Sequence, residues 1–195
     1  LSQNTIWVNE SLGIDPATGE EIFLDMNGNK VNEWSSANYK PFGSTDPKVY
    51  GTIGTMFVYK KWELNAYMYY KYGGYLYNST LVDKIENVNP NENGDKRILY
   101  DRWNAPGDVA KFKKVSDVSV TNPTSRFVEK ENYIQLQSLS LSYDFSGDQL
   151  RKMGIQRLKV SAIGNDIFKS STVKMERGTS YPYARTFSLS AQVTF

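Results

Sequence analysis

Strict alternation along the last eleven residues restricts this chain to folds that contain a two-faced β-strand. The apolar residues share one face and the polar residues the other: Phe187, Leu189, Ala191, Val193 and Phe195 against Thr186, Ser188, Ser190, Gln192 and Thr194. A soluble sheet would turn the apolar face toward a core, and a membrane barrel would turn it toward lipid. Residues 185–195 have the length of a tilted membrane-crossing strand, roughly 9 to 11 residues. Because the ends of soluble domains usually fray, a patterned strand that reaches the last residue favours a paired edge, as in a closed barrel, with a sandwich strand as the alternative.

The composition argues against enzymatic chemistry. The 195 residues, enough for one domain or two small ones, include no Cys and no His. Serine–histidine and cysteine–histidine nucleophiles and thiolate zinc sites are thereby excluded. A net charge of +2 gives no nucleic-acid footprint. We therefore expect no catalytic residues, no metal or cofactor, and no nucleic-acid partner.

Aromatic residues are abundant, with 14 Tyr and 4 Trp. Both types favour sites where one end of the side chain is apolar and the other is wet, such as membrane interfaces, protein interfaces and carbohydrate-binding surfaces. The sequence contains no apolar run long enough for a membrane-spanning helix and no signal peptide at its start. We expect either a cytosolic chain or one whose start has been removed.

The clearest hairpin is predicted over residues 47–72, with its turn at Lys60-Lys61. One face is apolar, with Tyr59 and Trp62 at one rim and Tyr70 and Tyr72 at the other. Two aromatic belts separated by aliphatic residues are typical of a wall that faces a bilayer. Met56 and Val58 on the opposite face weaken this pattern.

The rest of the chain is read as strands joined alternately by short and long connections. We predict strands at about 47–60, 62–78, 126–145, 156–168 and 185–195, a structured loop at 1–46 and a long loop at 79–125. A bulge is expected near Gln137, and a helical turn over 148–154. A hairpin with a type I′ turn is predicted at Asn27-Gly28, where Lys30 and Ser36 break the calcium-loop pattern that begins at Asp25. Alternating short turns and long loops are typical of outer-membrane barrels.

Seven segments, in order, resemble the C-terminal third of SusC/RagA-type TonB-dependent outer-membrane transporters. They are LGIDPATG (12–19), GSTDPKVYG (43–51), KYGGYLYNST (71–80), Arg102-Trp103 with PGD (106–108), YIQLQSLSLSY (133–143), GNDIF (164–168) and YPYARTF (181–187). Asp166 departs from the family, which often has an uncharged residue there.

The resemblance implies an all-β fold: about five C-terminal strands of a large, 22-stranded, antiparallel transmembrane barrel with long extracellular loops, in the bacterial outer membrane. It implies import of glycans above all, or of peptides, energised by TonB. The implied partners are a SusD-type surface lipoprotein, the remaining barrel and plug, TonB through the missing N-terminal part, outer-membrane lipid and the barrel-assembly machinery. On this interpretation the chain is a fragment that does not transport alone.

The candidate functional residues fall into three groups. The loop aromatics that could contact a ligand or the lipoprotein are Trp34, Tyr39, Trp103, Tyr181 and Tyr183. The membrane-interface aromatics are Tyr59, Trp62, Tyr70 and Tyr72, and the terminal strand read by the assembly machinery carries Phe187, Leu189, Ala191, Val193 and Phe195. The alternative function is a secreted, soluble β-rich module for carbohydrate binding or adhesion, in which the apolar face would form a conventional core.

Overall fold

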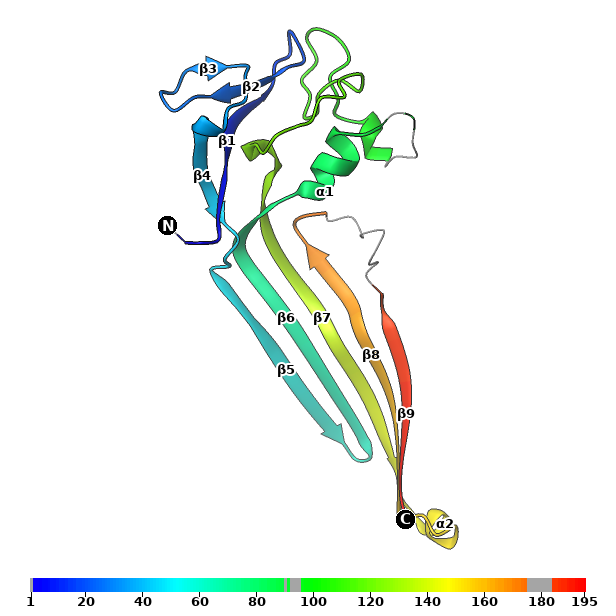
Figure 1. Ribbon diagram of the computed structural model, residues 1–195. Helices are drawn as coiled ribbons and strands as arrows, with labels where there is room; N and C mark the ends of the chain where they lie inside the picture. Colours follow the sequence, from blue (N-terminus) through cyan, green and yellow to red (C-terminus); the bar gives the residue numbers. More distant parts are fainter. Residues whose placement is uncertain (1, 90, 92–95, 175–183) are drawn as a thin grey trace. The chain divides into compact units, whose positions relative to one another are not determined.

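The computed structural model describes residues 2–89, 91, 96–174 and 184–195, and these form two compact units (Figure 1). Residues 1–47 and 74–130 make up one, here called the loop unit, and residues 48–73 and 131–195 make up the other, the sheet unit. Each unit is therefore built from two pieces of chain that are separated in the sequence. Among the described residues, no helix is long and apolar enough to cross a membrane.

The large sheet contains five strands in the order of the sequence (Figure 1). They are β5 (Val49–Tyr59), β6 (Trp62–Tyr77), β7 (Val128–Phe145), β8 (Arg157–Ser171) and β9 (Thr186–Thr194). β6 and β7 contribute residues to both units. Strands β5 and β9 form the two edges, so the sheet is open. Each strand therefore neighbours the strand that precedes or follows it in the chain.

The β5–β6 hairpin has the predicted register. Tyr59 pairs with Trp62 across the two-residue turn, in which Lys60 adopts the left-handed backbone conformation with φ 54°. Along the strands, Gly51 lies opposite Tyr70, whose ring occupies the space above the glycine. A Cβ at position 51 would lie 2.9 Å from the Tyr70 hydroxyl oxygen, so the glycine is needed for this close ring packing.

The predicted irregularity near Gln137 is present, but the additional residue lies on the neighbouring strand. The register passes from Leu136 paired with Phe168 to Ser138 paired with Asn165. One residue on β7 is thus matched by two on β8, and Asp166 takes a left-handed conformation with φ 53°. A bulge of this kind bends the strand that carries the extra residue. The sequence pattern showed a change of phase and not which of the two strands held the extra residue.

The connection from β7 to β8 includes the predicted helical turn, α2 (Asp148–Lys152), which ends before Gly154 at φ +75°. Strand β8 continues to Ser171 instead of ending at residue 168, because Lys169, Ser170 and Ser171 still pair with β7. The strand therefore extends past its predicted end.

The interpretation of residues 1–46 as a loop is wrong. They form a four-stranded sheet with the order β3-β2-β1-β4. Its strands are β1 (Thr5–Ile14), β2 (Glu21–Leu24), β3 (Lys30–Val31) and β4 (Tyr39–Ser44). The adjacent residues Val8 and Asn9 are both buried, so β1 shows no clean alternation between an apolar and a polar face. Without that alternation, the turn residues between the short strands were the clearest sequence signal, and they predicted a loop.

The predicted hairpin between β2 and β3 exists, with Phe23 opposite Val31, but its connection is longer than a two-residue type I′ turn. Residues 25–29 form the loop, and one carboxylate oxygen of Asp25 accepts hydrogen bonds from the backbone N–H groups of Asn27 and Asn29, each at 2.8 Å. The Asp25 side chain thus adds to the backbone hydrogen bonds that close the turn, from the Asp25 N–H to the Asn29 carbonyl at 3.0 Å and from the Gly28 N–H to the Asp25 carbonyl at 3.2 Å.

The long segment predicted as a loop at 79–125 is folded around a small core. Short helical turns punctuate the described part: α1 (Ser79–Leu81), η2 (Val82–Glu86), η3 (Lys96–Leu99) and η4 (Ser125–Phe127), besides η1 (Ser36–Asn38) further upstream. Val82, Ile85, Phe112 and Phe127 pack together as a buried cluster. Only Val82 and Ile85 are close in the sequence, and Phe112 and Phe127 are too distant from them to produce a periodic signal.

Candidate functional site

Two of the predicted loop aromatics, Trp34 and Tyr39, lie together in the loop unit. Their ring centroids are 5.6 Å apart at an interplanar angle of 77°, an edge-to-face arrangement. Between them in the sequence lies the short turn η1. The Ser35 side chain caps its start by accepting a hydrogen bond from the Ala37 N–H, and Tyr39 caps its end. The Trp34 indole N–H donates to the Pro123 carbonyl at 3.2 Å, which fixes the ring.

Trp103 has a different environment within the same unit. Its indole N–H donates to the Pro16 carbonyl at 2.9 Å, and its ring covers Gly19 so closely that a Cβ there would lie 2.6 Å away. This ring therefore holds the loops around residues 16–19 in place, and a ligand contact by Trp103 stays a prediction. Tyr181 and Tyr183 lie outside the described residues.

A cleft of about 430 Å³ opens beside Trp34 in the loop unit, and we call it the Trp34 cleft. It is lined by side chains from β2, from the segment after β3 and from the chain between Lys113 and Arg126. Its charged lining residues are Glu20, Glu21, Glu33, Asp117, Lys113 and Arg126. The volume is in the range of small-molecule sites, roughly 300 to 1,000 Å³.

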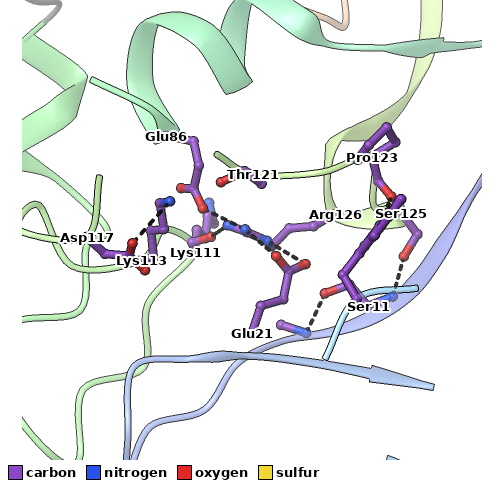
Figure 2. Close-up of polar contacts among 12 residues, drawn as sticks. Ser11, Glu21, Glu86, Lys111, Lys113, Asp117, Thr121, Pro123, Ser125 and Arg126 are labelled. Atoms are coloured by element: carbon purple, nitrogen blue, oxygen red, sulfur yellow. Dashed lines mark hydrogen bonds and ion pairs between the residues drawn. The ribbon is translucent and has the colours of Figure 1, made fainter. Parts of the chain in front are cut away.

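One wall of the cleft is fixed by Arg126, whose guanidinium lies between two carboxylates (Figure 2). Its Nη2 is 2.8 Å from Glu21 and 2.6 Å from Glu86, and its Nη1 donates to the Lys111 carbonyl. Burial disfavours the charged guanidinium, but the hydrogen bonds to Glu21 and Glu86 outweigh burial and raise the pKa of Arg126. The second Glu86 oxygen is buried with no hydrogen-bond partner among the described residues.

Lys113, which also lines the cleft, is paired as well. Its ammonium lies 3.6 Å from the Asp117 carboxylate and donates to the Ser119 carbonyl (Figure 2 shows the Asp117 contact). Burial would raise the pKa of Asp117, but hydrogen bonds from Ser119 and the charge of Lys113 lower it overall. Both cations of the cleft are therefore already neutralised by carboxylates.

The sheet unit presents one apolar face that no other layer of described residues covers. In one row across β7, β8 and β9, Leu141 pairs with Ala162, and Ala162 pairs with Leu189. The Trp62 and Tyr143 rings, 4.7 Å apart, join β6 to this face. Ile53 is 62% exposed, Phe187 74% and Leu189 84%. A soluble sheet would bury such a face.

The predicted interface aromatics lie on the same face of the β5–β6 hairpin. Tyr59 and Trp62 are at its turn end, and both are exposed. Tyr70 and Tyr72 are near the other end, where Tyr72 is exposed and Tyr70 covers Gly51. The rings thus lie at both ends of an apolar strip, and their place at the two interfaces of a bilayer stays a prediction.

The opposite face of the sheet unit carries paired polar groups. Lys159 lies 2.7 Å from Glu63, Lys71 lies 2.7 Å from Glu131, and the hydroxyls of Ser142 and Ser161 are 2.8 Å apart. These groups would be costly against lipid and are suited to a wet interior. Apart from the exposed apolar Met56 and Val58 of β5, which also lie on this face, the two faces differ as the outer and inner faces of a barrel wall do.

Comparison with known proteins gives one curated relative and a set of solved structures. TonB-dependent receptor P3 of Formosa agariphila is 24% identical over 206 residues, covering 95% of this chain. The chain resembles a segment of a TonB-dependent receptor. It spans about a fifth (20%) of the length of that relative. No protein-family model matches the chain.

Solved structures of the RagAB peptide importer share the fold. The "open-open" and "closed-closed" states each match with a TM-score of 0.77 and 18% identity, over 98% of this chain and 22% and 23% of theirs. A further structure, of the RagAB peptide transporter, gives 0.77 at 19% identity. With the receptor match, these confirm the predicted resemblance, the all-β barrel-wall fold and the outer-membrane location.

Sequence reasoning missed the Arg126 cluster and the Trp34 cleft. Glu21 and Arg126 are separated by 105 residues, and Glu86 and Arg126 by 40. No local motif marks such pairs, and only Trp34 itself could be selected from the sequence, as an aromatic residue in a polar segment.

Proposed function

We propose that the chain forms part of the wall and loops of an outer-membrane transporter that imports nutrients. The observation that carries this proposal is the five-stranded sheet whose exposed apolar face has aromatic rings at both ends and whose other face carries ion pairs. The name of the curated relative supports the same function. In this role the sheet unit crosses the bilayer, and the loop unit contacts cargo or a partner.

The proposed partners are a SusD-type lipoprotein, TonB and the remainder of the barrel with its plug. The SusC/RagA resemblance supports the lipoprotein, and the name of the relative supports TonB. Glycans are the cargo class favoured by the sequence resemblance, whereas the solved structures of the same fold are described as peptide importers. Both classes are therefore candidates, and we propose no enzymatic activity for the chain.

An uptake assay tests this function. Cells that express the full-length protein would be given a fluorescent oligosaccharide and, separately, a fluorescent oligopeptide, with and without an intact tonB gene. We expect accumulation of one of them that is lost without TonB or after a protonophore. Equal accumulation of both compounds in all cells, at the level of cells lacking the protein, would contradict the proposal.

A further inference from the structure

We infer that the Trp34 cleft binds a positively charged organic group, such as a lysine or arginine side chain or a free amino group of the cargo. This inference deepens the proposed function and rests on it, since it specifies what the loop unit recognises. It is based on the charge of the cleft, the fixed indole ring and the arrangement of the paired cations.

The cleft carries more negative than positive charge. Four carboxylates line it against two cations. Arg126 is held by Glu21 and by the buried Glu86, and Lys113 is held by Asp117. Glu20 and Glu33 are left, both on exposed residues. Among the described residues, the Glu20 carboxylate accepts a hydrogen bond only from the neutral side-chain amide of Asn32, at 3.3 Å, and no cation is paired with Glu33.

The paired cations also limit what can bind. An anionic ligand would have to displace Glu21 or Asp117 from Arg126 or Lys113, and doing so would leave a buried charge without its partner. A cation meets two carboxylates without breaking any ion pair. The arrangement therefore favours positive over negative cargo groups.

The half-buried Trp34 is also among the residues that line the cleft. The hydrogen bond from its indole to Pro123 and the edge contact with Tyr39 hold the ring in one orientation. A cation placed over the face of an indole ring is attracted by the negative charge of the ring's π electrons. A ring that is already fixed before binding loses little conformational entropy when the ligand binds. Carboxylates beside an aromatic ring thus suit an ammonium or guanidinium group.

A metal ion fits this cleft less well than an organic cation. The described residues contain no group of three or more Asp or Glu side chains placed to hold a metal. A neutral sugar could stack on Trp34, but it would gain nothing from the net negative charge. The sugar is therefore kept as an outcome of the test.

The experiment measures binding to the purified full-length protein in detergent, without TonB. The probes are trilysine, triglutamate and maltotriose, each titrated by calorimetry at low and at high salt. The variant is the double substitution Glu20→Gln with Glu33→Gln, which keeps side-chain size and leaves the Arg126 cluster intact. The matched control is Asp83→Asn, an exposed carboxylate of the same unit outside the cleft.

We expect trilysine to bind more tightly than the other probes and to weaken by on the order of tenfold in the double variant, with a change of less than about twofold in the control. High salt should remove most of this difference. Absence of trilysine binding, or equal binding by the double variant, would overturn the inference. Maltotriose binding that depends on Glu20 and Glu33, without trilysine binding, would assign the cleft to glycans instead.

Failure of this inference is distinguishable from failure of the proposed function. TonB-dependent uptake, together with probe binding that does not depend on Glu20 and Glu33, would contradict the cationic site and leave the transport function. Trilysine binding that depends on Glu20 and Glu33, in a protein that imports neither the oligosaccharide nor the oligopeptide, would contradict the transport function and leave the cationic site.

Discussion

The guanidinium of Arg126 joins Glu21 and Glu86, which come from the two sequence segments that make up the loop unit. The Glu86 side chain is fully buried and that of Arg126 is 11% exposed. The fold of this unit therefore depends on a charge cluster that no local sequence feature encodes.

Replacing Arg126 with Met should destabilise the loop unit by about 3–5 kcal/mol, because Glu86 would become a buried carboxylate without a partner. Hydrogen–deuterium exchange of residues 79–89 in the full-length protein would measure the loss. Combining Arg126→Met with Glu86→Leu and Glu21→Gln should recover most of the stability. An unchanged exchange rate in the single variant would show that Arg126 does not hold the unit together.

Gly19 and Gly28 form a matched pair for testing the role of Trp103. Both have positive φ, +75° and +84°, but only Gly19 lies under the Trp103 ring. Gly28→Ala should cost about 1–2 kcal/mol from backbone strain alone. Gly19→Ala should cost a further ~1–3 kcal/mol from the clash. Equal protease susceptibility of the two variants in the loop unit would argue against the packing of Trp103 on Gly19.

A pH effect is expected in the loop closed by Asp108. Its carboxylate accepts from the backbone N–H groups of Ala105 and Asn104, and these hydrogen bonds lower its pKa. A lowered pKa in the folded state means that the stabilisation is present above the ordinary Asp pKa, near 4, and is lost as the pH falls through the lowered value. Backbone exchange in residues 104–108, corrected for its intrinsic pH dependence, should rise in that window, and Asp108→Asn should abolish the pH dependence.

The two faces of β9 should respond oppositely to charge. Leu189→Lys would place an ammonium on the apolar face and should cost about 2–4 kcal/mol in a bilayer. Ser190→Lys, one position along and on the polar face, should cost much less. Folding into lipid vesicles, followed by the gel shift between folded and unfolded protein, compares the two. Equal folding yields would mean that β9 does not separate lipid from water.

The sheet unit could be predicted from the sequence because its strands carry their own pattern. Tyr59 and Trp62 mark a tight turn between two alternating segments, and residues 185–195 alternate without interruption. The loop unit could not, since β1 buries the neighbouring residues Val8 and Asn9 and its core gathers Ile85 and Phe127 from distant turns. The strand that holds the bulge was equally hidden, because a change of phase does not show which partner carries the extra residue.

The same distinction applies to the candidate site. Trp34 and Tyr39 could be chosen for their chemistry, and the structure brings them together. The charges around them depend on Arg126 and Lys113, whose partners follow only from the tertiary fold. Trp103 has the same sequence signature as Trp34 but is packed on Gly19. Residue type therefore identifies candidate residues but does not establish what each of them does.

The most direct test of the central claim is the lipid accessibility of β9, measured residue by residue. The chain contains no Cys, so single cysteines can be placed at positions 186–194 of the full-length protein, with any other cysteines removed, and spin-labelled in lipid vesicles. Labels at 187, 189, 191 and 193 should be accessible to oxygen in the bilayer and protected from a water-soluble nickel complex, with the reverse at 186, 188, 190, 192 and 194. Labels at 187, 189, 191 and 193 that are protected from both reagents would place the apolar face in a protein core and contradict the barrel-wall account.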